Sequence, residues 1–261
     1  FLIESMDTPQ QKLFKVLLIG DSCEDEYIYG RCERLNPEAP VPVLNYSKIE
    51  TKAGMAGNVY LNLQAFDLEV TFLTNNEQIT KTRFIDEKSN QQMLRVDNEP
   101  RVAPLILPVM TNGFDAVVIS DYNKGYLSDK KLFEIVESSS IPVFIDSKKT
   151  VLPDKENCFI KINDVEYDRL QPYDYKNLIV TKGSKGCVYN HTLYPAEKVK
   201  VYDVVGAGDT FLAALTYGYL KTEGDMSRAL SLANKAAAVA VQNQGTYVLQ
   251  QKDVEKICNR R

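Results

Sequence analysis

One short stretch combines residue types that suit the transfer of a phosphoryl group to an alcohol. It reads Gly206-Ala207-Gly208-Asp209 and precedes an apolar segment typical of a helix. Backbone N–H groups of residues 206–208 would be unpaired at the helix start, where the helix dipole favours negative charge on a transferring phosphoryl group. The carboxylate of Asp209 can accept the proton of the alcohol. Taken alone, the string is equally consistent with an ordinary capped helix start.

Other common catalytic motifs are absent. There is no GxxxxGK[ST], which disfavours a P-loop enzyme. The glycine stretch has Phe211 where a dinucleotide fold needs a third small residue, and it does not follow the first strand. His191 is the only histidine and lies in a turn-like segment, which disfavours histidine-dependent triads and His-rich metal sites. General base work therefore falls to a carboxylate.

Composition indicates an ordinary enzyme domain. The chain has 261 residues, 44% of them hydrophobic and 25% charged, which is enough for one core with a small appendage. The net charge of −4, without a basic run, disfavours nucleic acid as a partner. No stretch approaches the roughly 20 apolar residues of a membrane span, and the apolar run at residues 1–3 is too short for a signal peptide.

The five cysteines are scattered and lack any CxxC spacing. This favours thiols in a reducing compartment over disulfides or zinc, and we expect a cytoplasmic protein.

Short apolar runs alternate with amphipathic stretches in a βαβ rhythm, which predicts a mostly parallel sheet between helices. The expected strands are 15–19, 70–73, 116–119, 143–145, 159–162 and 178–180. The expected helices are 57–66, 129–138, 209–221, 226–243 and 252–259. Antiparallel strands are expected at 40–46, 81–86 and 91–96, and we interpret the regions of about 29–49 and 79–97 as a lid. We expect one domain, residues 1–261.

Polar residues follow most of the expected strands, where a parallel sheet binds its ligands. These loop residues are Asp21, Asp25, Asn58, Asp121, Asp146, Lys148, Asn163 and Glu166. Each alone is more consistent with a cap or a turn, but their recurrence after successive strands predicts a site.

Along most of its length the chain resembles the ribokinase-like (PfkB-type) sugar kinases, and most closely their heptose 7-phosphate kinase branch. The Gly-x-Gly-Asp box marks the superfamily, while Pro37-Glu-Ala-Pro-Val-Pro42 and Ser120-Asp-Tyr-x-Lys-Gly125 are more specific to the heptose branch. Other matching stretches are Gly20-Asp21 with Asp25, 27–30, 54–59, 79–83, 90–97, the NxxE element 163–166, the turn 181–186 and 203–210. The resemblance implies a three-layer α/β/α core with a β-strand lid.

The resemblance also implies roles for individual residues. Asp209 would be the base and Gly206, Ala207 and Gly208 the anion hole. Asn163 and Glu166 would organise Mg²⁺ through water, and Asp203 with the carbonyl of Val205 resembles a monovalent-cation site, which K⁺ would occupy. The implied sugar-binding residues are Asp21, Asp25, Gly54, Asn58, Asp121 and Asp209. The implied ATP-binding residues are Asp146, Lys148, Asn163, Glu166, Thr181, Lys182, Gly183, Gly186, Gly206, Gly208 and Asn234.

A phosphate already present on the sugar would need cationic contacts. Arg34, Lys124 and Lys148 are the candidates, because cations near an acidic site need a reason. Each is equally consistent with a solvated side chain.

The chain also departs from the family pattern. About thirty residues, including a helix, are missing between Asn76 and Ile79, and a helix after Leu170 is nearly absent. Another chain or polar residues should then replace the lost cover of the sheet. Met55 stands in place of the second glycine of a usual Gly-Gly pair.

We therefore expect ATP-dependent phosphoryl transfer to a hydroxyl of a sugar or sugar phosphate, with the anomeric hydroxyl of heptose 7-phosphate as the expected acceptor. Met55 and the missing segment leave another acceptor open, such as ribose, fructose or a nucleoside. The trimmed helices also leave open a catalytically silent sugar- or nucleotide-binding protein. Exposed lid edges predict a homodimer formed through the lids.

Overall fold

In the computed structural model, which describes residues 13–259, eight strands form the central sheet in the order β12-β11-β10-β9-β8-β7-β1-β4. The strands from β10 to β4 run parallel, and β10, β11 and β12 pair antiparallel. Their bounds are β1 Lys15–Gly20, β4 Glu69–Thr74, β7 Ala116–Asp121, β8 Val143–Ser147, β9 Cys158–Asn163, β10 Leu178–Thr181, β11 Cys187–Tyr189 and β12 Thr192–Tyr194. All six strands predicted from apolar runs are confirmed. The expectation for residues 1–3 lies outside the described residues.

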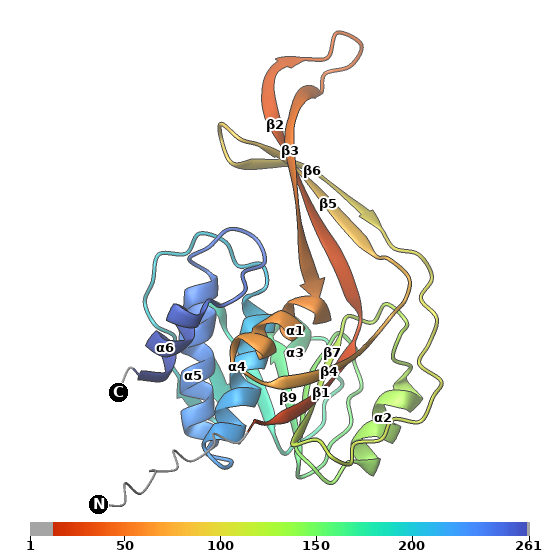
Figure 1. Cartoon of the computed structure of the whole chain (residues 1–261), viewed down its shortest axis with the longest axis vertical. Helices are drawn as coiled ribbons and strands as arrows, with labels where there is room; N and C mark the ends of the chain where they lie inside the picture. The colour runs from red at the N-terminus through yellow and green to blue at the C-terminus, as the bar shows by residue number, and fades with distance from the viewer. Residues whose placement is uncertain (1–12, 260–261) are drawn as a thin grey trace, which may run out of the picture.

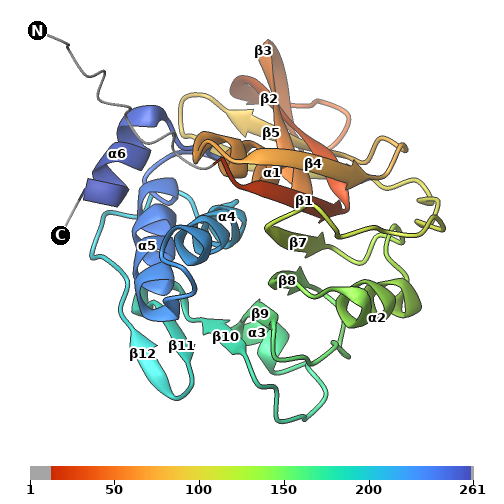
Figure 2. The same ribbon diagram turned by 60° about the horizontal axis from the view of Figure 1, so that its bottom comes forward.

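Helices cover the two faces of the sheet unequally (Figure 2). One face carries α1 Ala56–Ala65, α4 Ala207–Lys221, α5 Met226–Ala240 and α6 Gln251–Asn259. The other carries α2 Asp129–Ser138. The five predicted helices are confirmed, although α5 ends three residues earlier than expected. A short helix, α3 Asp164–Tyr167, and a 3₁₀ turn, η1 Gly183–Lys185, were not predicted.

The α2 face is partly covered by loops. Val102, Leu105, Leu152, Leu170 and Tyr175 pack against its core. The expectation that another chain or polar residues must replace the trimmed helices was therefore incomplete, since the chain's own loops supply part of the cover.

The shortened connection between β4 and the lid is held by one side chain. Oδ1 of Asn75 accepts the N–H of Ser22 at 2.8 Å, and Nδ2 of Asn75 donates to the carbonyls of Ser22 and Glu77 at 3.2 and 2.6 Å. Asn75 thus satisfies backbone groups that a tight connection leaves unpaired.

A separate four-stranded sheet in the order β3-β2-β5-β6 forms an arm above the body (Figure 1). Its strands are β2 Ser22–Leu35, β3 Pro42–Met55, β5 Thr80–Asp86 and β6 Gln91–Asn98. The predicted lid is confirmed, but its first two strands are longer than expected, since β2 begins directly after β1 and β3 ends directly before α1. The assignment of several site candidates to loops was wrong. Asp25, Asp121, Asp146 and Asn163 lie in strands β2, β7, β8 and β9, and Asn58 and Glu166 lie in helices α1 and α3.

Met55 joins the lid to α1 in a strained backbone conformation. Its φ is 55° and its ψ is −133°, and its side chain is 4% exposed. Such a conformation suits glycine and costs other residues of order 1–3 kcal/mol. The departure noted in the sequence therefore has a structural cost.

Among residues 13–259, no helix has both the length and the apolar character needed to cross a membrane.

Candidate active site

The start of α4 forms the centre of the site. Gly206 precedes the helix with φ 77°, a left-handed conformation that favours glycine. A Cβ on Gly206 would lie 2.7 Å from Nδ2 of Asn58, and one on Gly208 would lie 2.9 Å from Nζ of Lys161. A side chain at either position would therefore have to displace one of these polar groups. The N–H of Ala207 donates to the carbonyl of Val204 at 3.3 Å, so the expectation of an unpaired N–H was wrong for this residue.

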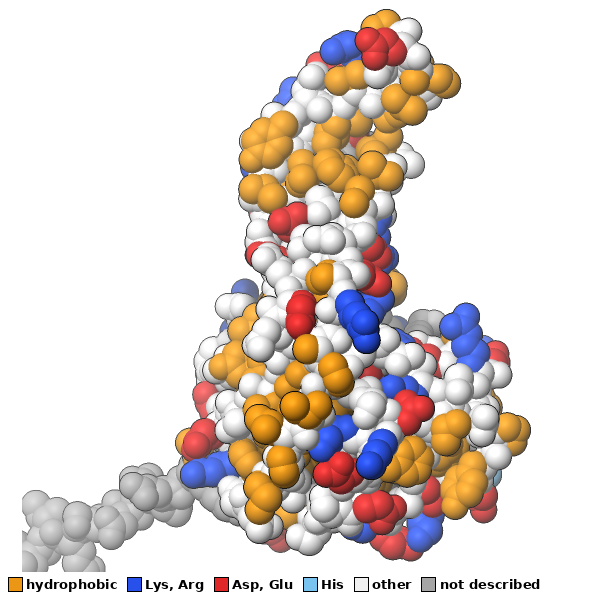
Figure 3. All heavy atoms as spheres, turned by 90° about the vertical axis from the view of Figure 1, so that its right-hand side faces the viewer, with side chains coloured by type: hydrophobic (Ala, Val, Ile, Leu, Met, Phe, Trp, Pro, Cys, Tyr) orange, Lys and Arg blue, Asp and Glu red, His pale blue; other side chains and the backbone are white. Residues whose placement is uncertain are grey.

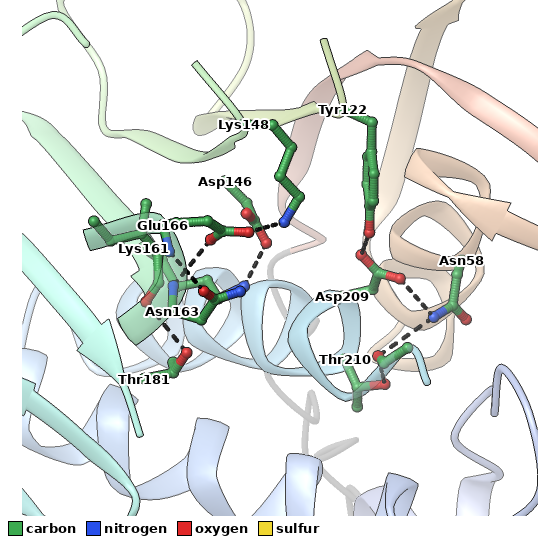
Figure 4. A network of polar contacts seen from close by, with 12 residues as sticks. Asn58, Tyr122, Asp146, Lys148, Lys161, Asn163, Glu166, Thr181, Asp209 and Thr210 are labelled. Carbon is green, nitrogen blue, oxygen red and sulfur yellow. Dashed lines mark hydrogen bonds and ion pairs between the residues drawn. The ribbon is translucent and has the colours of Figure 1, made fainter. Parts of the chain in front are cut away.

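Asp209 lies in the first turn of α4 and is 4% exposed. Its Oδ1 accepts the hydroxyl of Tyr122 at 2.9 Å, and its Oδ2 accepts Nδ2 of Asn58 at 3.1 Å (Figure 4). Asn58 is fixed in turn by Nδ2 of Asn62, which donates to the Asn58 side-chain oxygen at 3.1 Å. The carboxylate is therefore held by donors from two elements on different sides.

The pKa of Asp209 is raised to about 6, chiefly because the carboxyl group is buried. The hydrogen bond from Asn58 lowers this pKa, the charge of Asp146 raises it, and Tyr122 and Lys161 lower it. A pKa near working pH is what a general base needs, because the group must be ionised yet basic enough to take a proton.

Asp146 and Lys161 form a buried ion pair beside Gly208. Asp146 is 5% exposed and Lys161 is 3% exposed. Asp146 was an expected nucleotide-side residue, whereas Lys161 received no role from the sequence. A lysine inside the apolar strand Phe159-Ile-Lys-Ile162 was the available signal, since lysines are rarely buried unless paired.

Asn163 and Glu166 form a capping box at the start of α3. The Glu166 N–H donates to Oδ1 of Asn163, and Oε2 of Glu166 accepts the Asn163 N–H, both at 2.9 Å. The other carboxylate oxygen of Glu166 pairs with Lys148. A cavity of about 120 Å³ adjoins them, lined by Lys148, Lys149, Asn163, Val165, Glu166 and Arg169. The structure therefore brings Lys148, Asn163 and Glu166 together.

Within residues 13–259, no group of three or more His, Cys, Asp or Glu side chains is arranged to hold a metal ion. A Mg²⁺ ion beside Glu166 would take most of its oxygen ligands from water and nucleotide phosphates, as Mg²⁺ commonly does. The Asn163–Glu166 donor set fits the water-mediated role that the sequence suggested.

The turn at 181–186 connects the β10–β11 hairpin. Gly183 has φ 53° and Gly186 φ 98°, and a Cβ on Gly186 would lie 2.0 Å from the carbonyl oxygen of Tyr194. The N–H of Lys182 donates to the Gly186 carbonyl at 2.7 Å, and Oγ1 of Thr181 donates to the Ile162 carbonyl at 3.2 Å. These bonds and the two glycines fix the shape of the turn, and its expected role toward ATP stays a prediction.

The expected ATP-binding residue Asn234 and the expected cation-site residue Asp203 both anchor loops. Nδ2 of Asn234 donates to the carbonyl of Tyr194 at 2.9 Å. Asp203 accepts the N–H groups of Val205 and Gly245 at 3.0 and 2.8 Å. Asp203 thus joins the two loops next to Gly206, and its role with the Val205 carbonyl toward a cation stays a prediction.

On the lid side of the site, Asp25 pairs with Arg83 of β5 at 2.6 Å, and both residues are buried. A Cβ on Gly54 would lie 2.3 Å from Oδ2 of Asp25, so glycine there makes room for the carboxylate. Arg83 was missed by the sequence reasoning, because its contact with Asp25 depends on the parallel pairing of β2 with β5.

Asp21 and Asp121 support the loop after β7. Asp21 accepts the N–H groups of Lys124 and Tyr126 at 3.2 and 3.3 Å. Asp121 accepts the Ser147 hydroxyl at 2.7 Å and the Asn123 N–H at 2.9 Å. Both carboxylates are 1% exposed. These bonds hold the loop that carries Tyr122, and the expected role of both carboxylates in sugar binding stays a prediction.

Of the three phosphate candidates, the structure places one far from Asp25 and pairs another with a carboxylate. Arg34 lies near the outer end of β2, nine residues beyond Asp25, which corresponds to about 30 Å along an extended strand. The ammonium group of Lys124 pairs with Glu99 at 2.6 Å. Lys148 does lie beside the site.

Comparisons with known proteins agree with this geometry. The family model described as pfkB family carbohydrate kinase matches residues 166–253. The "Bifunctional protein HldE" of Nitratiruptor sp. is 32% identical over 300 residues, which cover 93% of this chain and 64% of that protein. The chain thus spans less than two thirds of the length of this relative.

Solved structures show the same fold. Arabidopsis thaliana ribokinase, complexed with ribose and ATP, aligns with a TM-score of 0.67 and 16% identity over 96% of this chain and 100% of the ribokinase. Escherichia coli phosphofructokinase-2, in complex with potassium, aligns with a TM-score of 0.68 and 16% identity over 94% and 98% of the two chains. With its central sheet, separate lid sheet and buried Asp209 beside the glycine cradle, this chain belongs to the pfkB family of carbohydrate kinases and has a ribokinase-like fold.

Proposed function

We propose that this chain transfers the γ-phosphoryl group of ATP to a hydroxyl of a sugar or sugar phosphate. The observation that carries the proposal is the placement of Asp209. Its buried carboxylate lies in the first turn of α4, directly after the glycine cradle and close to the Asp146–Lys161 pair. A base, an anion cradle and a buried cation thus meet at one place.

The reaction follows from this arrangement. Asp209 takes the proton of the acceptor hydroxyl, whose oxygen then forms a bond to the γ-phosphorus. The bond from that phosphorus to the bridging oxygen breaks in line, and ADP leaves. The N–H groups at 206–208 stabilise charge on the transferring group, and the start of the α4 dipole adds to this effect.

Cations complete the nucleotide side. Mg²⁺, when bound, would neutralise the charge of the ATP phosphates, with Asn163 and Glu166 orienting its waters. Thr181, Lys182, Gly183, Gly186 and Asn234 would border the adenine and ribose. A K⁺ ion held by Asp203 and the Val205 carbonyl is part of the proposal, and the potassium complex of phosphofructokinase-2 supports it.

Charge on the lid supports an acceptor that already carries a phosphate. Lys52 on β3 and Lys81 on β5 lie opposite Asp25 in the register of the lid strands. Their side chains therefore share one face of the sheet with Asp25 and with Arg83, two residues after Lys81. Lys52, Lys81 and Arg83 thus face a single carboxylate, that of Asp25. Arg95 on β6 does not add to this excess of positive charge, because two hydrogen bonds join it to Asp97. We propose that Lys81 and Arg83 contact this phosphate in place of Arg34 and Lys124.

Heptose 7-phosphate is the proposed acceptor, with the anomeric hydroxyl as nucleophile. The likeness to HldE supports it, together with the lid cations. Met55 favours the alternative of another sugar or a nucleoside, since it introduces a side chain where the family has glycine. A silent binding protein is disfavoured by the intact arrangement around Asp209.

The test is ADP release with Mg-ATP over a panel of acceptors: heptose 7-phosphates, ribose, fructose, fructose phosphates and nucleosides. Turnover with one acceptor, abolished in Asp209→Asn, would support the proposal and identify the substrate. If no acceptor turns over while calorimetry still detects ATP binding, the silent binding protein becomes the better interpretation.

We also propose that two copies pair through their lids. Hydrophobic side chains gather on the lid arm (Figure 3). The exposed hydrophobic residues of the lid strands include Leu35 and Tyr46, each 66% exposed, and Leu94, 56% exposed. Pairing would cover these side chains and the edges of β3 and β6. Light scattering at micromolar concentration should give the mass of a dimer, and a monomer would contradict the proposal.

We also propose a cytoplasmic localisation. All five cysteines are free thiols in the structure, which is typical of proteins in a reducing compartment.

A further inference from the structure

Tyr122 is held in place by the two aspartates beneath its loop. It directly follows β7, whose last residue, Asp121, accepts the N–H of Asn123 at 2.9 Å, while the Asp121 carbonyl accepts the N–H of Lys148 at 2.9 Å. Asp21 accepts the N–H of Lys124. These bonds fix the backbone on both sides of Tyr122, so its side chain extends from a rigid loop.

The hydroxyl of Tyr122 points at Asp209 and donates to Oδ1 at 2.9 Å (Figure 4). Burial, followed by the charges of Asp209 and Asp146, raises the pKa of Tyr122 well above its ordinary value. The phenol therefore stays protonated and keeps its role as a donor.

The ring of Tyr122 lies between two regions of the site. Nζ of Lys81, on lid strand β5, lies 5.6 Å from the ring centroid, and Nζ of Lys148 lies 5.2 Å from it. Lys148 also pairs with Glu166 on the nucleotide side. Ammonium groups at such distances are attracted to the ring. One residue thus contacts the lid, the nucleotide side and the base.

We propose that Tyr122 is a positioning residue for the proposed reaction: its hydroxyl fixes the orientation of the Asp209 carboxylate, and its ring links that carboxylate to the lid through Lys81 and to the nucleotide side through Lys148. The proposal rests on the proposed kinase function. It gives Tyr122 a role that the phosphoryl-transfer chemistry does not itself require.

The consequence can be separated from the effects of other groups around Asp209. Asn58, on α1, donates to the second carboxylate oxygen. Asp146 on β8, Lys161 on β9, Lys148 and Cys23 on β2 are the other groups whose charges or polar atoms interact with Asp209. Removing the Tyr122 hydroxyl leaves all of these in place. The carboxylate then loses one of its two donors, so it rotates more freely and becomes a stronger base.

The test uses three variants of the full chain. Tyr122→Phe removes the hydroxyl and keeps the ring, Tyr122→Leu removes both, and Tyr126→Phe removes a hydroxyl from the same loop as a control. We expect kcat to fall about 10- to 100-fold in Tyr122→Phe, the size typical for loss of a hydrogen bond to a charged group, with little change in the acceptor KM. The fall should be larger in Tyr122→Leu, and Tyr126→Phe should match the wild type.

The pH dependence gives a readout that a merely structural role would not change. The acidic limb of kcat/KM should move to higher pH in Tyr122→Phe by about one unit, because the ionised form of Asp209 is less stabilised. Carboxyl ¹³C NMR of Asp209, assigned by comparison with Asp209→Asn, should show the same displacement without any turnover.

Two results would overturn the inference in distinguishable ways. An unchanged Asp209 titration in Tyr122→Phe refutes it whether or not an acceptor is found. If the Asp209 titration is displaced in Tyr122→Phe but the wild-type protein turns over no acceptor, the proposed function is refuted, and the positioning role in that reaction with it.

Discussion

Lys161 and Asp146 form a buried ion pair in contact range of the glycine cradle, such that a methyl group on Gly208 would lie 2.9 Å from the Lys161 ammonium. This relationship connects the stability of the sheet to the chemistry at the start of α4. The ammonium group also lowers the pKa of Asp209, whereas Asp146 raises it. The balance between the two charges thus contributes to the basicity of the proposed base.

Lys161→Met should destabilise the protein by about 3–5 kcal/mol, because Asp146 is left buried without its partner. The double variant Lys161→Met/Asp146→Leu should recover much of this loss, since the pair is replaced by apolar groups of similar volume. Urea unfolding measures both. Activity should stay low in both variants. A single variant as stable as the wild type would show that the pair is not buried as described.

The sequence predicted the elements well and the contacts between side chains less well. Asp209 and Asn58 were both expected at the site, and they touch. Arg34 was expected near the acceptor phosphate, because the sequence around it does not show how long the lid strands are. In the structure β2 has 14 residues, and Arg34 lies near its outer end. The contact between Asp25 and Arg83 could be predicted only from the register of β2 with β5, two parallel strands far apart in the chain. Such pairings depend on tertiary structure, which local patterns do not specify.

Asp209→Asn should abolish transfer yet increase stability at neutral pH. Burial raises the pKa of Asp209 from 3.8 to about 6, so the folded state binds a proton more tightly than the unfolded state between these values. Wild-type stability therefore falls as pH rises through this window, by on the order of 3 kcal/mol. Thermal unfolding should show Asp209→Asn melting several degrees higher at pH 8. The difference should disappear near pH 4, and an equal advantage at both pH values would contradict the account.

The pH–rate profile should report the same group. Since the base must be ionised, kcat/KM should rise with pH through about 6 and then level off. A profile already flat below pH 5 would indicate that a group with an ordinary carboxyl pKa, or none at all, limits the reaction.

At position 55 we expect glycine to be more stabilising than alanine, the reverse of the usual order. Because Met55 has φ 55° and ψ −133°, alanine at this position stays strained while glycine does not. Met55→Gly should therefore be more stable than Met55→Ala by about 1–3 kcal/mol in urea unfolding, although glycine is normally the less stable of the two. Both should lose the packing of the buried methionine side chain. The same variants, tested on the acceptor panel, show whether this side chain restricts the sugar.

Lys81→Met separates the two ideas about the acceptor phosphate. Lys81 lies beside Tyr122 on the lid face that carries excess positive charge, whereas Lys124 is neutralised by Glu99. For a phosphorylated acceptor, KM should rise about tenfold in Lys81→Met, as expected when one charge-assisted contact is lost. KM for ATP should change little, and Lys176→Met, which alters an exposed lysine paired with Glu156, is the matched control. If KM rises instead in Lys124→Met, the phosphate binds where the sequence first suggested, and the lid cations serve another purpose.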